Sequence, residues 1–416
     1  MAGDLMGKAA DWAFTKRFRR GGFDWRASRL ASERIAEALA EIHAVARHDP
    51  LHAADGAVRL LVKLSPALEQ VDSSSGALGS AARAAVDALV PVIAHAPADG
   101  TVREKWLEQM FAAIQDDDPP YLELLDERWG ELCATQEVAS RWADRLKDLV
   151  QHVHAERRRG RHAFTRSESA CYSALFAAGR QDELIALIGS NPRPMWNDLL
   201  WVGRCSVARG EIDEAIAFMT KAVNPWTPMA GLARFAEGVL LQAGRRVEAY
   251  EKYALEANRA TTYLATFRLL SKKYPEIDAD RLLTDLIATT PGEESKWFAT
   301  AKTLKRFDLA MQLAWKSPCD PKTLIRAARD NVAKNPAFAA EVALAALYWI
   351  CQGRGYELTS LDVQMAYRFA TEAGLALGQS ERVALRIQTM LKPMTREVRW
   401  VRERLNLPAS SEAGRS

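Results

Sequence analysis

The sequence predicts an all-α protein in which a helical repeat array follows an N-terminal helical domain. Alternation of β-branched residues never persists, whereas Ala, Leu, Glu, Arg and Gln dominate, as they do in helices. Apolar residues instead recur at helical spacing between clusters of Gly, Pro and Asp. In the C-terminal two thirds a helix, a tight glycine turn and a second helix recur about every 31 to 34 residues, which is typical of stacked helix pairs.

Length and composition fit a folded protein. The chain has 416 residues, of which 48% are hydrophobic and 26% charged, so it is long enough for two domains or one elongated array. The most apolar window, Ala339 to Cys351, carries Glu341 and is predicted to be a buried helix. Neither a membrane span nor a signal peptide is expected. Five cysteines without a CxxC motif are predicted to be buried thiols of a cytoplasmic protein.

The N-terminal third contains a series of predicted helices separated by cap and turn residues. Pro50, the Ser-rich turn at 72–76 and the Asp-Asp-Asp-Pro-Pro run at 116–120 separate most of them. A solvated acidic turn is expected at residues 116–118. The predicted helices are Ser28 to Arg47, Ala53 to Val71, Leu78 to Ala96, one capped by Thr101, Tyr121 to Leu132, and Gln136 to Arg159.

The segment around residues 156–164 is the predicted domain boundary, because composition turns sharply basic there and Gly160 can end the preceding helix. The expected organisation is an N-terminal helical domain over 1–155, a basic linker over 156–164, the repeat array over 165–392, and a C-terminal helix with a polar tail over 393–416.

Three turns carry the repeat signal. Each has Gly followed by a second helix with Glu-Ala or Glu-Leu near its start, and the three turn glycines are Gly179, Gly210 and Gly244. A degenerate version around Lys305 falls about two periods later. The pattern predicts five helix pairs in register, each with an apolar face that only a neighbouring pair can cover.

Residues 196–228 resemble a tetratricopeptide repeat. Gly203 and Gly210 flank the close-packed turn, Ala215 and Ala222 occupy the small-residue positions, and Pro225 or Pro228 follows. Neighbouring repeats depart from that pattern, with Glu237 and Lys305 where consensus glycines would sit. The resemblance implies an α-solenoid of antiparallel helix pairs whose first helices line a binding groove.

A second resemblance covers about residues 15–100. The Phe-Asp-Trp-Arg run at 23–26 and the Val-Asp-Ser-Ser-Ser-Gly-Ala-Leu-Gly run at 71–79 are similar to an uncharacterised family of bacterial helical proteins. That resemblance implies no activity.

The sequence gives little indication of catalysis. All seven histidines lie within the first 162 residues, so the repeat array has none for acid–base or metal chemistry. His152 and His154, two residues apart, are expected on opposite sides of their helix. No glycine-rich phosphate loop is present in its required context. We therefore expect a protein that is not an enzyme and needs no cofactor or metal.

Aromatic and arginine residues are the candidates for partner binding. Trp, Tyr and Arg on a groove make binding hot spots, and several tryptophans lie near the starts of first helices. Packing in the core is the alternative role for these aromatic residues, and a solvated linker is the alternative for the arginines. The candidate residues are Trp196, Trp201, Trp226, Tyr263, Arg157, Arg158, Arg159 and Arg161.

The predicted function is a non-enzymatic scaffold or adaptor that holds a peptide or protein partner in the groove of the array. The alternative is a nucleic-acid-associated regulator that uses the basic segments 8–29 and 157–161. Alternatively, segment 8–29 is a helix that docks its aromatic face on the first helix pair. A third alternative is a hydrolase that uses only paired carboxylates.

Overall fold

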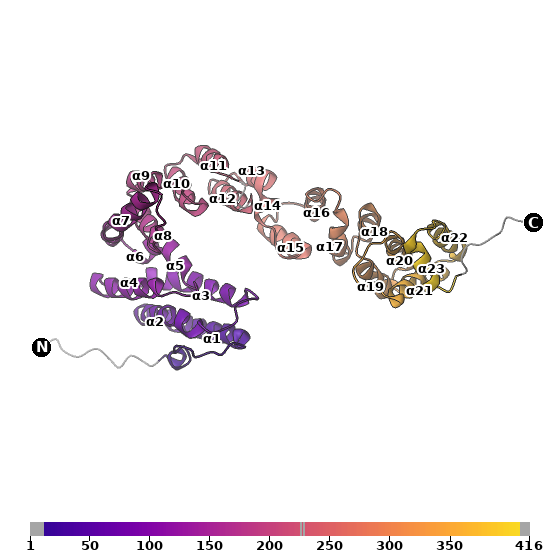
Figure 1. Ribbon diagram of the computed structural model, residues 1–416, viewed down its shortest axis with the longest axis horizontal. Coiled ribbons are helices and arrows are strands. Elements are labelled where there is room, and N and C mark those ends of the chain that lie inside the picture. The colour runs from indigo at the N-terminus through magenta and orange to yellow at the C-terminus, as the bar shows by residue number, and fades with distance from the viewer. Residues whose placement is uncertain (1–11, 225–226, 228, 408–416) are drawn as a thin grey trace, which may run out of the picture. The chain divides into compact units, whose positions relative to one another are not determined.

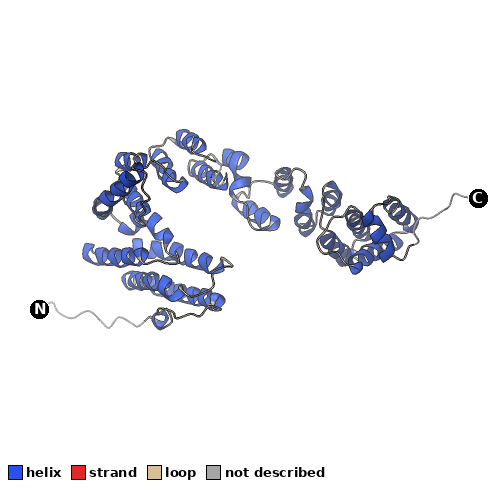
Figure 2. Cartoon of the chain, viewed as in Figure 1, coloured by secondary structure: helices blue, strands red, loops and turns tan. Residues whose placement is uncertain are grey.

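The computed structural model describes residues 12–224, 227 and 229–407, and these residues form helices and connecting turns without any strand (Figures 1 and 2). The prediction of an all-α fold is thereby confirmed. The chain divides into two compact units, residues 1–227 and 228–416, here called unit 1 and unit 2. This division falls inside the predicted array and differs in place from the predicted linker at 156–164.

Unit 1 contains an N-terminal stack of long helices followed by shorter pairs. Its helices are η1 (Ala13–Lys16), α1 (Ser28–Ala46), α2 (Pro50–Leu68), α3 (Ala77–Ala94), α4 (Gly100–Gln115), α5 (Glu123–Glu127), α6 (Trp129–Cys133), α7 (Gln136–Arg158), α8 (Glu168–Ala177), α9 (Gln181–Gly189), α10 (Trp196–Ala208) and α11 (Ile212–Lys221).

Unit 2 consists of further helix pairs and includes one long apolar helix, α20. Its helices are α12 (Met229–Gln242), α13 (Arg246–Ala249), the π-helical turn η2 (Tyr250–Ala254), α14 (Leu255–Ala257), α15 (Tyr263–Lys273), α16 (Ala279–Ala288), η3 (Glu294–Trp297), α17 (Phe298–Thr303), α18 (Phe307–Lys316), α19 (Pro321–Asn331), α20 (Pro336–Cys351), α21 (Ser360–Ala376), α22 (Ser380–Met390) and α23 (Arg396–Arg404).

Each unit has its own hydrophobic core. The core of unit 1 runs from Trp12 to Cys205, and that of unit 2 from Tyr250 to Val401. In unit 2 the predicted buried helix is α20, which packs against α18, α19, α21, α22 and α23. All five cysteines are buried free thiols, as expected.

One described helix, α3, is long and apolar enough to cross a membrane by length and composition alone. Seven of its residues, among them Leu78, Val86 and Ile93, are buried, and it packs against α1, α2 and α6. This packing is that of a core helix.

Several helix boundaries differ from the predicted ones, and side-chain caps explain why. Helix α2 starts at Pro50, three residues before the predicted start, because the Asp49 carboxylate accepts a hydrogen bond from the His52 amide and Pro fits the first helical position. The predicted helix from Tyr121 to Leu132 is instead two short helices, α5 and α6, that meet at Arg128.

The turns of the repeat pattern share one hydrogen-bond geometry. At Gly179, Gly210 and Gly244 the backbone is left-handed, with φ of 74°, 83° and 74°. In each turn the glycine amide donates to the carbonyl three residues earlier and the next amide donates to the carbonyl five residues before it. Lys305 has the same pair of bonds and a φ of 58°, so a lysine takes the conformation that favours glycine.

This shared geometry predicts opposite effects for two substitutions in unit 2. Lys305→Gly should raise the free energy of unfolding by about 0.5–1 kcal/mol, because it relieves a left-handed side-chain clash. Gly244→Ala should lower the free energy of unfolding by about 1 kcal/mol, because alanine disfavours the left-handed conformation that glycine adopts there. Nothing lies within 4 Å of the added Cβ, so this backbone strain is the whole expected effect. Urea unfolding followed by circular dichroism measures both, and equal signs for the two changes would contradict the argument.

Candidate functional site

A pocket in unit 2 is the strongest candidate binding site. It lies among the loop before α15, the start of α15, the end of α16 and η3, and its volume is about 200 Å³. The residues that line it are Leu255, Arg259, Ala260, Thr261, Thr262, Tyr263, Thr266, Leu286, Thr289, Thr290 and Trp297. It therefore combines two aromatic rings, aliphatic groups and several threonine hydroxyls.

Hydrogen bonds hold the wall of this pocket in place. The Thr262 hydroxyl caps α15 by accepting from the Ala265 amide at 3.1 Å. The Thr266 hydroxyl accepts from the Ala260 amide at 2.9 Å and so ties the preceding loop to the helix. These two bonds fix the loop that forms one side of the pocket.

Two aromatic residues also line the pocket. Tyr263 and Trp297 pack edge to face with ring centroids 4.8 Å apart. The Trp297 indole N–H donates to the Thr290 hydroxyl at 3.1 Å, and the Trp297 side chain is buried. Tyr263 is half-buried. The pocket is thus preformed, with its aromatic wall locked in one arrangement.

Charges near the pocket are paired. Arg259, which lines it, lies 2.9 Å from the Glu256 carboxylate, and Lys296 beside Trp297 lies 2.7 Å from Glu293. The other lining groups are hydroxyls, rings and aliphatic chains. Such groups bind and orient a ligand, but they do not exchange protons near neutral pH.

The predicted tryptophans take different positions. Trp201 is buried, with its ring 5.7 Å from that of Phe176 on α8, and Trp196 at the start of α10 is half-buried. Trp226 lies outside the described residues. Tyr263 is the one predicted aromatic residue that lines the unit 2 pocket, where it meets Trp297, a residue that the sequence argument did not single out.

Arg204 is a further residue that sequence reasoning missed. Its guanidinium lies 4.3 Å above the Trp201 ring, and burial lowers its pKa below the usual range. No carboxylate of the described residues lies within 4 Å of it, so no internal ion pair neutralises it. Its spacing of three residues from Trp201 on one helix was the available signal.

The arginines of the predicted cluster are paired with nearby carboxylates and backbone carbonyls of the same chain. Arg159 and Arg161 both pair with Glu156, at 2.6 and 2.7 Å. Arg157 pairs with Glu168 at 2.8 Å and donates to the Ala163 carbonyl, while Arg158 donates to the Ser190 carbonyl. Arg157 and Arg158 therefore tie the end of α7 to α8 and to the end of α9, whereas Arg159 and Arg161 fold back onto Glu156 of α7 itself.

The basic N-terminal segment is described from residue 12 onward. Its aromatic side chains at Trp12, Phe14, Phe18 and Phe23 are buried in the core of unit 1, while Trp25 is exposed. Among the described arginines, Arg17, Arg20 and Arg29 pair with Glu37, Glu69 and Glu33. The aromatic face thus docks on the first helices, as the alternative interpretation of segment 8–29 predicts.

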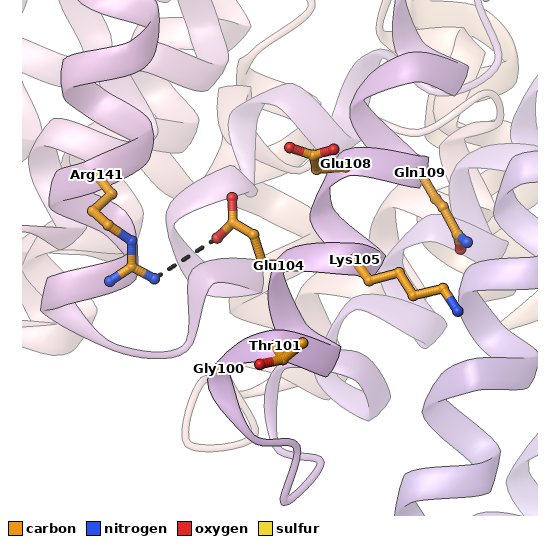
Figure 3. Close-up of a pocket in the computed structure, with 7 residues that line it drawn as sticks. All are labelled: Gly100, Thr101, Glu104, Lys105, Glu108, Gln109 and Arg141. Atoms are coloured by element: carbon orange, nitrogen blue, oxygen red, sulfur yellow. Dashed lines mark ion pairs between the residues drawn. The ribbon is translucent and has the colours of Figure 1, made fainter.

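A groove between α4 and α7 is shown in Figure 3. Lys105 and Gln109 line it from α4, and Arg141 reaches toward Glu104 across the groove, with 3.7 Å between their charged atoms. A second pair, Arg145 and Glu108, joins the same two helices at 2.9 Å. These ion pairs account for the charges of the groove as contacts between helices.

Asp117 and Asp126 in unit 1 are two buried carboxyl groups that influence each other electrostatically. Asp117 is buried and accepts from the amides of Tyr121 and Leu122, so the expected solvated acidic turn is wrong at this residue. Burial and then the charge of Asp117 raise the pKa of Asp126 to about 8. Both side chains are at least nine-tenths buried, which keeps a glycoside-sized substrate away from them.

His154 is the one buried histidine among the described residues. His152 is exposed, so the two point to opposite sides of α7 as expected. The His154 ring nitrogens lie 2.9 Å from the Ser190 hydroxyl and 3.2 Å from the Tyr172 hydroxyl. Burial, reinforced by the nearby Arg157 charge, lowers its pKa to about 4. It is a neutral, hydrogen-bonded core histidine.

In the described ranges no group of three or more His, Cys, Asp or Glu residues is arranged to hold a metal ion. Comparison of the sequence with protein-family models and with curated proteins finds no match. The function is therefore inferred from the geometry of the chain itself.

The depressed pKa of His154 predicts an acid-sensitive unit 1. Between about pH 6.5 and pH 4 the unfolded chain binds a proton at this residue while the folded chain does not, so stability falls as pH falls through that window. His154→Gln should reduce this fall. His152→Gln on the exposed side of the same helix is the matched control.

Thermal unfolding at pH 7, 5.5 and 4.5 measures the effect. The loss of melting temperature between pH 7 and 4.5 should be smaller in His154→Gln than in the wild type, whatever the absolute stability of the variant. An equal loss in His154→Gln, His152→Gln and the wild type would contradict the assignment.

Proposed function

We propose that this chain is a non-enzymatic interaction protein that holds a peptide or a protein loop, with the pocket at Tyr263 and Trp297 as an anchor for one partner side chain. The observation that carries the proposal is this preformed pocket, in which aromatic and aliphatic groups lie beside several threonine hydroxyls, because recognition sites combine apolar walls with polar groups that orient a ligand. Its lining groups favour binding over catalysis.

The size of the pocket supports a single-residue anchor. An engineered apolar cavity of about 150 Å³ accommodates benzene, and the present pocket measures about 200 Å³. One large aliphatic or aromatic side chain of a partner fits that volume. Burying such a side chain contributes about 1.5–3 kcal/mol, which suits a central contact in a larger interface.

The rigidity of the pocket also favours binding. Its loop is fixed by Thr262 and Thr266 and its aromatic wall by the Trp297–Thr290 hydrogen bond. A site that is already ordered loses little conformational entropy when a ligand enters. The partner therefore meets a surface that need not rearrange first.

The repeat-like organisation is consistent with an interaction scaffold. Turns of one geometry recur at Gly179, Gly210, Gly244 and Lys305, and the small residues Gly203 and Ala215 are buried where helices cross. We propose on this basis a tetratricopeptide-like array, a class that commonly presents peptide-binding surfaces. The five buried free thiols accord with a cytoplasmic location.

Selection of peptides from a random displayed library on the full chain tests the proposal. We expect enriched peptides to share a large apolar residue and to bind with micromolar affinity. Thr261→Trp should weaken them at least tenfold, because Thr261 is exposed at the pocket and the larger ring would fill it. Thr284→Trp, an exposed position on α16 outside the pocket, is the matched control.

Circular dichroism and melting temperature establish that both variants are folded. A selection that enriches no peptide would argue against an interaction function of this kind. Peptides that bind Thr261→Trp as tightly as Thr284→Trp would remove the pocket from the proposal and leave the anchor elsewhere.

A further inference from the structure

The charges of unit 2 divide between the first and second helices of its pairs. The first helices of three consecutive pairs, α12, α15 and α17, carry five Lys or Arg residues and one acidic residue, Glu237, which is buried. The second helices α13 to α14, α16 and α18 carry four basic and six acidic residues. The first helices are therefore strongly basic, although the chain as a whole has a net charge of only +3.

Most of the basic residues on the first helices lack an internal partner. Lys273 is the exception, since it lies 2.7 Å from the buried Glu237 carboxylate. No carboxylate in the part of the chain that the structure describes lies within 4 Å of the other four. These unpaired residues are Arg234, Arg268, Lys272 and Lys302.

The acidic residues of the second helices are mostly neutralised. Glu248 pairs with Arg245 and Lys252, and Glu256 pairs with Arg259. Asp280 pairs with Arg306, and Asp285 accepts from the Tyr250 hydroxyl at 2.7 Å. Most acidic residues of the second helices thus have partners within the chain, whereas most basic residues of these first helices do not.

Three of these unpaired cations, Arg234, Arg268 and Lys272, are exposed, and Lys302 is half-buried. Arg268 and Lys272 are four residues apart on α15, so they share one exposed face with Leu269 between them. Arg234 lies ten residues before the left-handed turn at Gly244, and Lys302 three residues before the one at Lys305. Seven residues complete almost two helical turns, so positions three and ten residues before equivalent turns lie on corresponding sides of their two helices.

The first helices also lie along one edge of unit 2. In Figure 1, α15, α17 and α19 follow each other along the lower edge, with α16, α18 and α20 above them. Helix α15 packs against both η3 and α17. The basic residues of α15 and α17 therefore come from neighbouring helices.

We infer that the first helices α12, α15 and α17 of unit 2 form the docking surface for an acidic peptide segment of a protein partner. The inference rests on the proposed interaction function and assigns the chemistry of its partner. Carboxylates of the partner pair with Arg234, Arg268, Lys272 and Lys302, and the exposed aliphatic side chains of Met229 and Leu269 on the same helices contact apolar residues between them.

The surface suits a peptide better than a single-stranded nucleic acid. Bases bind without sequence preference by stacking on exposed aromatic faces. The exposed large apolar residues on α12 and α15 are aliphatic, and Tyr263 and Trp297 already pack on each other. Carboxylates with aliphatic neighbours are the complementary chemistry.

Helix α10 of unit 1 shows the same chemistry independently. Arg204 there has no carboxylate of the described residues within 4 Å, and its guanidinium lies over the Trp201 ring, the kind of Trp–Arg pair that forms binding hot spots. An acidic partner is the counterpart for this residue as well.

Fluorescence anisotropy with defined probes tests the inference on the full chain. The first probe is a labelled 16-residue peptide that repeats Glu-Leu-Glu-Glu, and the second is the same peptide with Gln for every Glu. The third is a labelled 16-nucleotide oligothymidine. We expect the Glu peptide to bind at least tenfold more tightly than the Gln peptide, and its affinity to fall as salt rises from about 50 to 200 mM.

A triple charge reversal locates the contact. Arg234→Glu, Arg268→Glu and Lys272→Glu together should weaken the Glu peptide at least tenfold. Lys316→Glu, Arg382→Glu and Arg399→Glu form the control, because they change the net charge of the same unit equally from helices α18, α22 and α23. Circular dichroism confirms that both triple variants are folded.

Three results would overturn the inference: equal affinity for the Glu and Gln peptides, equal weakening by the two triple variants, or tighter binding of the oligothymidine than of the Glu peptide. The proposed function is judged separately by the displayed-peptide selection. Apolar peptides that depend on the pocket but are indifferent to the Arg234, Arg268 and Lys272 reversal would sustain that function and remove only the acidic partner.

Discussion

Each short helix pair of this chain can bury its apolar face only against a neighbouring pair, and the rest of the architecture follows from that constraint. A helix of about ten residues is marginal in water by itself, so its stability comes from packing. Tight left-handed turns such as those at Gly179 and Gly210 reverse the chain within a few residues and hold the two helices of a pair together. The stacked pairs together form two hydrophobic cores, one in each unit.

Departures from the repeat pattern are accommodated by local compensation. Glu237 stands where a small residue is typical, yet its buried carboxylate accepts hydrogen bonds from the Tyr274 hydroxyl, the Lys273 ammonium and the Asn258 amide. A buried carboxylate is tolerated when such partners surround it. This network joins α12 to α15 just where the π-helical turn Tyr250–Ala254 interrupts the second helix of the pair.

The structure separates charges that serve the fold from charges that remain available. Arg157, Arg159 and Arg161 form a dense basic cluster in sequence, but they pair with Glu168 and Glu156. Arg268 and Lys272, in contrast, do not stand out in the sequence and have no carboxylate within 4 Å among the described residues. Density along the chain is thus a poor guide to a free cationic surface, because the i, i+3 and tertiary partners decide what remains unpaired.

The sequence by itself determined the helical class, the turn positions and the burial of the cysteines, because helical periodicity, glycine turns and caps act over a few residues. It also pointed to Tyr263. Only the tertiary structure brought Trp297 and Thr290 to that residue, buried Asp117 and His154, and divided the cores near Thr227. These features join residues far apart in the sequence or depend on which helix faces pack, and the packing of whole helices decides both.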